Sequence, residues 1–106
     1  MAARPKRART ARRESARAAS QLSRDREKLS RLEPGGRPEA PLDVPSSSVI
    51  ETRAAAVPCP RCDGTQVVEE HAAVTGPSGS RLREARLRCR RCGSQRSLWF
   101  RLPLPN

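Results

Sequence analysis

The sequence predicts a small α+β protein with a basic N-terminal helix, a linker, and a three-stranded antiparallel sheet in its C-terminal half. Three observations predict this class. Residues 1–33 are dominated by helix-forming Ala, Arg, Leu and Glu and contain no aromatic or β-branched aliphatic side chain. Residues 34–47 are rich in Pro and Ser, which is typical of an extended, mobile linker. Beyond residue 64, β-rich segments alternate with clusters of turn-forming residues.

The composition excludes a large hydrophobic core. The chain has 106 residues, 35% of them hydrophobic, and its only aromatic residues are Trp99 and Phe100. A chain this small and this poor in apolar groups usually needs a disulfide, a metal or a partner for stability. Its four cysteines are the obvious candidates for that extra stabilisation.

The N-terminal segment predicts a helix over residues 10–32. Eight positions at alternating spacings of three and four form a leucine stripe, as along a coiled-coil seam, and all but Asp25 are small or apolar. They are Ala8, Ala11, Ser15, Ala18, Leu22, Asp25, Leu29 and Leu32. Only the three leucines are large, so an isolated helix would be marginal, and we expect fraying in its first half. Pro34, Gly35 and Gly36 end it.

The remaining residues predict strands. We expect an edge strand at 48–57, a hairpin with arms at 65–74 and 81–89, and a third strand at 94–102. Leu82 is out of phase with Ala85 and Leu87, which predicts a bulge or a late start of the second arm. Three segments result: a basic, partly helical arm (1–33), a flexible linker (34–47), and a domain with a leading strand (48–106).

Two Cys-x-x-Cys pairs are the most specific signal in the sequence. Cys59 and Cys62 are followed by Asp-Gly, and Cys89 and Cys92 by Gly-Ser, with 26 residues between the pairs. Two intervening residues let both sulfurs reach one ion, and four thiolates fill a tetrahedral shell. The sequence therefore predicts one structural zinc ion per chain, with an iron site or a redox-active pair as alternatives. The lone histidine, His71, is expected to be a solvated strand residue.

With these cysteines, Pro60, Gly93 and the strand pattern, residues 57–102 resemble the zinc-ribbon group. Members include the C-terminal ribbon of transcription elongation factors and several ribosomal proteins. The resemblance implies two knuckles on a three-stranded antiparallel sheet, in proteins that bind nucleic acid, dock on large assemblies or brace larger chains. The elongation-factor ribbons carry an acidic pair at the hairpin tip, where this chain has Gly76-Pro-Ser-Gly79. That departure argues against a role in a polymerase active site. Residues 1–33 resemble no family.

The net charge of +11 favours polyanionic partners. We expect nucleic acid or a ribonucleoprotein to be bound mostly through phosphates. The expected contacts on the sheet are Arg86, Arg88, Arg90, Arg91, Arg96, Trp99 and Arg101. A fully solvated basic face is the plainer interpretation of the same residues. Two alternatives remain open: a protein-interaction adaptor that docks through Leu22, Leu29 and Leu32 or through a hairpin edge, and a redox or metal-handling protein.

Other function classes find no support in the sequence. It contains no phosphate loop, nucleophile motif or cofactor fingerprint, so we expect neither an enzyme nor a small-molecule substrate. No segment is apolar enough for a membrane helix or a secretory signal. We therefore expect a cytoplasmic protein that does not associate with membranes.

Overall fold

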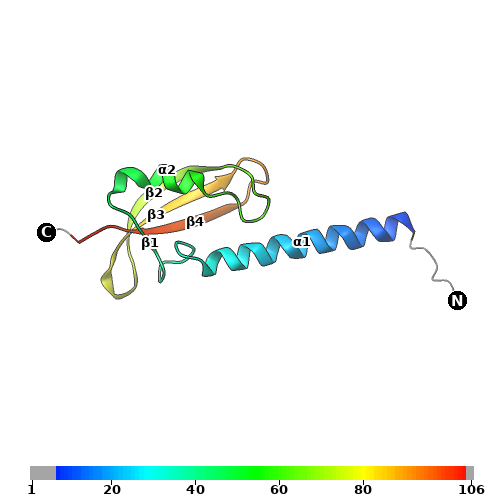
Figure 1. Cartoon of the computed structure of the whole chain (residues 1–106), viewed down its shortest axis with the longest axis horizontal. Helices are drawn as coiled ribbons and strands as arrows, with labels where there is room; N and C mark the ends of the chain where they lie inside the picture. The colour runs from blue at the N-terminus through cyan, green and yellow to red at the C-terminus, as the bar shows by residue number, and fades with distance from the viewer. Residues whose placement is uncertain (1–6, 105–106) are drawn as a thin grey trace.

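The computed structural model describes residues 7–104 and has the predicted α+β composition (Figure 1). Two helices, α1 (Ala8–Leu32) and α2 (Ile50–Ala56), precede most of the sheet. The strands are β1 (Leu42–Asp43), β2 (Gln66–Thr75), β3 (Arg81–Cys89) and β4 (Gln95–Arg101). Two 3₁₀ turns, η1 (Ser47–Val49) and η2 (Pro77–Gly79), complete the secondary structure.

The sheet has four strands and is mixed, so the prediction of three antiparallel strands was incomplete. Its order is β1-β4-β3-β2, with antiparallel β2, β3 and β4 as expected. The extra strand, β1, comes from the segment expected to be a flexible linker and runs parallel to β4. Arg101 binds the Asp43 carboxylate through two nitrogens, at 2.7 and 3.0 Å. The Val44 amide donates to the Arg101 carbonyl at 3.1 Å.

The start of the expected linker is also attached to the sheet. The Trp99 amide donates to the Gly35 carbonyl at 2.9 Å, and the Gly35 amide donates to the Ala40 carbonyl. Gly36 lies so close to the end of α1 that a Cβ there would collide with the Ser30 carbonyl oxygen. These contacts fix where α1 leaves the sheet.

The prediction of a strand at 48–57 was wrong, because this segment forms η1 and α2. Val49, Ile50 and Thr52 are β-branched and favoured the strand. Ile50 and Ala54, however, lie four residues apart, and both are completely buried. The helical period therefore places both on the face that packs on the sheet, and three consecutive alanines support a helix.

One small core lies between α2 and the sheet. Its buried members are Val44, Ile50, Ala54, Ala85, Leu87, Leu98 and Phe100. Phe100 is inside as predicted, whereas Trp99 lies on the opposite side of β4 and is half-buried. The metal knuckles lie at the end of this core where β3 finishes.

The hairpin has its irregularity in β2, not near Leu82. The register of β2 and β3 shifts between Val68 and Glu70. Leu82 is buried although it is out of phase, because the hairpin loop covers it. A Cβ on Gly76 would collide with the Leu82 side chain, so the loop needs glycine at that position.

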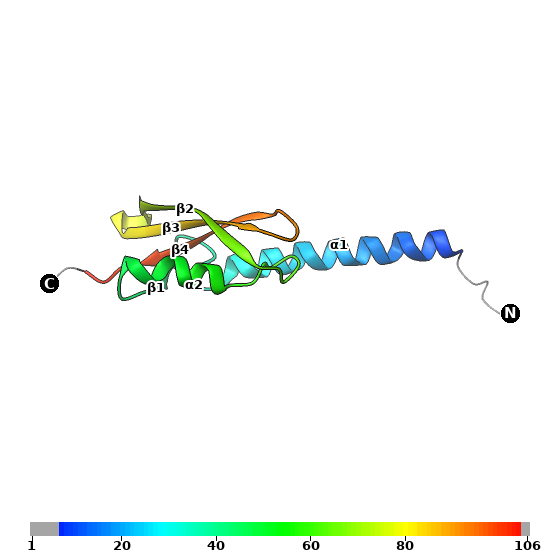
Figure 2. The same ribbon diagram turned by 90° about the horizontal axis from the view of Figure 1, so that it is seen from above.

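Helix α1 is unbroken from Ala8, where we had expected fraying. Its C-terminal part lies beside the domain, and its N-terminal half extends beyond the sheet in both views (Figures 1 and 2). Leu22, Leu29 and Leu32 are 56%, 59% and 64% exposed. The leucine stripe is therefore not part of the core.

Candidate metal centre

The four cysteines converge from two separate loops. Cys59 and Cys62 lie between α2 and β2, while Cys89 ends β3 and Cys92 lies in the turn to β4. All four sulfurs lie within 4.8 Å of one another. The Cys59 and Cys92 sulfurs are 3.7 Å apart, and those of Cys62 and Cys89 are 3.4 Å apart.

These distances fit a tetrahedral metal site. Metal–sulfur bonds of about 2.3 Å place neighbouring sulfurs about 3.8 Å apart at the corners of a tetrahedron. None of the four thiols forms a disulfide. The cysteines are thus positioned to hold one metal ion, and the arrangement is compatible with zinc.

The two knuckles, residues 59–64 and 89–94, share one backbone pattern. The Cys59 amide donates to the Gly64 carbonyl, and the Cys89 amide donates to the Ser94 carbonyl, both at 2.9 Å. In each knuckle, the amide two residues after the first cysteine points at that cysteine's sulfur, at 3.4 and 3.3 Å. These amides stabilise thiolate charge before any metal binds.

The two glycines of the knuckles have different roles. Gly93 has φ of 77° and provides the left-handed turn of the second knuckle. In the first knuckle, Asp63 takes that conformation, with φ of 61°. Gly64 is needed for space, because a Cβ there would lie 2.9 Å from the Cys89 sulfur and 3.1 Å from the Cys62 sulfur.

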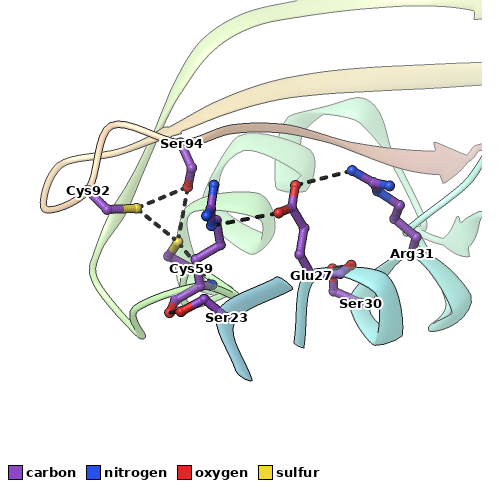
Figure 3. A network of polar contacts seen from close by, with 8 residues as sticks. Ser23, Glu27, Ser30, Arg31, Cys59, Cys92 and Ser94 are labelled. Carbon is purple, nitrogen blue, oxygen red and sulfur yellow. Dashed lines mark hydrogen bonds and ion pairs between the residues drawn. The ribbon is translucent and has the colours of Figure 1, made fainter. Parts of the chain in front are cut away.

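Ser94 is a polar neighbour that the sequence analysis missed. Its hydroxyl lies 3.1 Å from the Cys92 sulfur and 3.3 Å from the Cys59 sulfur, so it touches one cysteine of each knuckle (Figure 3). The Ser94 hydroxyl lowers the pKa of Cys92 to about 6, aided by the Ser94 backbone amide. A hydroxyl two residues after the last cysteine was the signal in the sequence.

The pKa values of Cys62 and Cys89 are shifted in opposite directions. Desolvation is the main cause that raises the pKa of Cys62 to about 12, with the Cys89 thiol adding to it. Hydrogen bonds, first from the Cys92 amide and then from the Arg91 amide, lower the pKa of Cys89. A bound divalent cation would favour the thiolate form of all four.

Polar contacts link α1 to the first knuckle. Ser23 donates its hydroxyl to the Arg61 carbonyl at 3.2 Å, and Arg26 pairs with Asp63 at 3.2 Å. Glu27 lies between Arg31, at 3.1 Å, and Arg61, at 3.7 Å (Figure 3). The knuckle that carries Cys59 and Cys62 is thus also the surface on which α1 rests.

A further bond joins the two knuckles directly. Arg91 in the second knuckle donates to the Cys62 carbonyl at 3.1 Å.

His71 lies apart from the cluster, on the side of β2 that faces α2, with Nδ1 3.6 Å from a Glu51 oxygen. It is not one of the residues that surround the candidate metal position.

The residues of the sheet that were expected to contact nucleic acid have unlike surroundings in the structure. Three of the arginines form ion pairs: Arg86 with Glu70 at 3.3 Å, Arg88 with Glu69 at 3.2 Å, and Arg101 with Asp43 at 2.7 Å. Each of these charges already has a carboxylate beside it.

The other expected contacts are spread over the domain. Arg90 and Arg91 are exposed on the second knuckle, and Trp99 is half-buried next to the Gly35 carbonyl. Arg96 is partly buried; desolvation lowers its pKa, and Glu33 and the Cys59 thiolate act in the opposite direction. The seven residues therefore differ in pairing and in exposure.

The basic residues of α1 have a different environment. Arg9, Arg12, Arg13 and Arg17 are exposed on the projecting half of the helix. Within residues 7–104, these four arginines have no ion-pair partner. The projecting half of α1 therefore carries a series of arginines without ion pairs, and in the rest of the described chain the same holds for Arg37, Arg53, Arg81, Arg83, Arg90, Arg91 and Arg96.

Comparisons with protein-family models, curated proteins and solved structures gave no match. In the described part of the chain, no helix is both long and apolar enough to cross a membrane.

Proposed function

We propose that this chain is a structural-zinc protein without enzymatic activity that associates with nucleic acid or a ribonucleoprotein through basic surfaces. The observation that carries the proposal is the cluster of four sulfurs within 4.8 Å. Four thiolates leave no open coordination position for water or substrate, which is the arrangement of a structural ion. Zinc is favoured over iron because it needs no redox role and because small cysteine-rich ribbons commonly fold around it.

Zinc would supply stability that this core lacks. Apparent binding free energies of structural zinc are on the order of 10 kcal/mol or more, while a core of seven buried side chains contributes little beyond its entropy cost. The four thiols are free, which is consistent with a reducing compartment such as the cytoplasm.

The charge of α1 supports a polyanionic partner. Arg9, Arg13, Arg17 and Arg24 fall within about 80° of one another around the helix, over about 22 Å of its length. A row of unpaired guanidinium groups at this spacing suits phosphates, which arginine contacts with two N–H groups at once. In the sheet, by contrast, Arg86, Arg88 and Arg101 each already have an acidic partner.

A salt series tests the nucleic-acid proposal. Single-stranded RNA and duplex DNA of about 20 nucleotides are titrated with zinc-loaded protein between about 50 and 200 mM salt. Binding through several phosphates should weaken by about 10–1,000-fold over this range. Binding that does not respond to salt, or no binding at 50 mM, would contradict the proposal.

Matched variants locate the surface. Replacing Arg9, Arg13 and Arg17 together by Gln should weaken binding. It should also reduce the slope of the logarithm of the binding constant against the logarithm of the salt concentration by about three, one for each lost phosphate contact. Replacing Arg37, Arg53 and Arg81 by Gln removes the same charge from exposed positions on the domain. If both triple variants lose affinity equally, the binding reflects total charge and not α1.

A further inference from the structure

The leucine stripe of α1 is largely exposed in the described structure, and only Leu29 borders the groove beside the first knuckle. Its three leucines are each more than half exposed. At about 100° per residue, the stripe lies roughly 110° around the helix from the face that touches the first knuckle. It also lies roughly 150° from the row formed by Arg9, Arg13, Arg17 and Arg24. Leu29 also lines the open groove between α1 and the first knuckle, so a partner on the stripe would border that knuckle and leave the arginine row free.

We infer that the stripe binds a second copy of the same helix in antiparallel orientation, so that the chain forms a symmetric dimer. The reason is a mirror relation in the sequence. Helix α1 runs from residue 8 to residue 32, so Ser20 is its centre, and small and large side chains exchange places about that centre. In an antiparallel pair centred on Ser20, Leu32, Leu29 and Leu22 of one copy face Ala8, Ala11 and Ala18 of the other.

Antiparallel pairing matches side-chain sizes across the interface. The leucines lie in the second half of α1 and the alanines in the first half, so an antiparallel neighbour places a large side chain opposite a small one at each level. The pair overlaps along the whole 25-residue helix, about 37 Å. Helices in proteins owe most of their stability to a packed apolar face, and the projecting half of α1 has none among residues 7–104.

The polar positions of the stripe favour the antiparallel orientation. A parallel pair in register would place Asp25 against Asp25, two like charges in the seam. The antiparallel pair places Asp25 against Ser15, whose hydroxyl can donate to the carboxylate. At the flanks, Glu14 of one copy approaches Lys28 of the other.

The charges also predict how the dimer responds to salt. Residues 8–32 contain eight basic and three acidic side chains, so two copies repel each other overall. On one flank, Arg12 of the second copy approaches Arg26, although Asp63 at 3.2 Å partly offsets that charge. Salt screens this repulsion and should tighten the dimer, which is the opposite of its effect on phosphate binding.

The test is sedimentation velocity of the zinc-loaded full chain from about 5 to 500 µM. We expect a monomer–dimer equilibrium with a dissociation constant on the order of tens of micromolar, and a lower constant at about 500 mM salt than at 50 mM. A monomer at every concentration and both salt levels would overturn the inference. Since phosphate binding is measured separately, either proposal can fail without the other.

A matched pair of variants tests the interface. Leu22→Glu with Leu29→Glu should weaken the dimer at least tenfold, because it places charge on the stripe. Ala16→Glu with Ser20→Glu adds the same charge to exposed positions outside the stripe and should leave the dimer within about threefold of the original. Circular dichroism confirms that each variant keeps its helix. Equal effects of the two variants would contradict the stripe as the interface.

A distance between two spin labels tests the antiparallel orientation of the helices. A nitroxide on Thr10→Cys, attached while zinc protects the native thiols, should lie about 30 Å along the helix axis from its equivalent in an antiparallel dimer. The Thr10 level of one copy then meets the Ser30 level of the other. A pulsed electron paramagnetic resonance distance below about 20 Å would indicate parallel pairing and overturn the proposed geometry.

Discussion

Arg26 on α1 and Asp63 in the first knuckle form an ion pair of 3.2 Å across 37 residues of sequence. Asp63 holds the left-handed conformation that ends the Cys59–Cys62 turn, with φ of 61°. The residue that shapes the candidate metal knuckle therefore also holds the long helix. The position of α1 depends on the order of that knuckle.

Breaking this contact should loosen α1 without emptying the metal site. With Arg26→Ala combined with Ser23→Ala, we expect faster tryptic cleavage at Lys28 and Arg31, because two of the contacts between α1 and the knuckle are lost. The metal content should remain at one ion per chain. Arg24→Ala with Gln21→Ala removes a contact that is confined to the helix and serves as the control. Equal cleavage of all three proteins would contradict this anchoring role.

Ser94 should affect metal affinity. Its hydroxyl contacts the sulfurs of Cys92 and Cys59, and loss of such outer partners typically weakens metal binding by about 10–100-fold. We expect Ser94→Ala to release zinc to a chromophoric chelator at a correspondingly lower chelator concentration. Ser97→Ala is the matched control, since that hydroxyl lies three residues later, in β4, and donates to Glu84 at 2.7 Å. Unchanged zinc affinity in Ser94→Ala would show that the contact has no energetic role.

Helix α2 should be essential for stability. Ile50 is completely buried between α2 and the sheet, and truncating such a side chain typically costs about 2–5 kcal/mol. Urea unfolding of Ile50→Ala at fixed free zinc should show a loss of this size. Thr52→Ala, on the exposed side of the same helix, should stay within about 0.5 kcal/mol of the original protein. A small effect of Ile50→Ala would mean that α2 does not pack as described.

The attachment of β1 depends on the charge of Asp43. The hydrogen bond from Arg101 lowers the pKa of Asp43, so its carboxylate stays charged throughout the neutral range. The stabilisation is present above the usual aspartate pKa and is lost as the pH falls through the lowered value. Asp43→Asn at pH 7 should imitate the acidic state without removing the metal.

Hydrogen exchange measures that effect. The Val44 amide donates to the Arg101 carbonyl and should exchange faster in Asp43→Asn, while the Leu98 amide in the middle of the sheet should not change. Glu39→Gln, an exposed change on the same segment, is the control. Unchanged exchange at Val44 would show that main-chain pairing alone holds β1.

The sequence predicted the features that have a clear period or spacing. The four cysteines, the hairpin and β4 follow from ligand spacing and from alternating side chains, and α1 follows from its composition. The sequence did not reveal α2, because a seven-residue helix with Val49, Ile50 and Thr52 at its start has too few turns to outweigh β propensity. It also did not reveal β1, since a strand of two residues in a short segment between Pro41 and Pro45 carries no pattern.

The surroundings of the charges could not be obtained from composition. Arg86 and Arg88 looked like free cations until the register of β2 and β3, and the shift at Glu69, placed a glutamate beside each. Ser94 became relevant only when both knuckles were folded together. Pairing across strands is a property of register, which a one-residue shift changes completely.

The measurement that tests the central claim most directly is the metal content of protein purified without added metal, by elemental analysis and native mass spectrometry. The sulfur geometry predicts one zinc ion per chain and loss of the β signal in circular dichroism when a strong chelator removes it. One zinc ion whose removal leaves the fold unchanged would contradict the structural role. Iron, or no metal with disulfides among Cys59, Cys62, Cys89 and Cys92, would contradict the zinc centre itself.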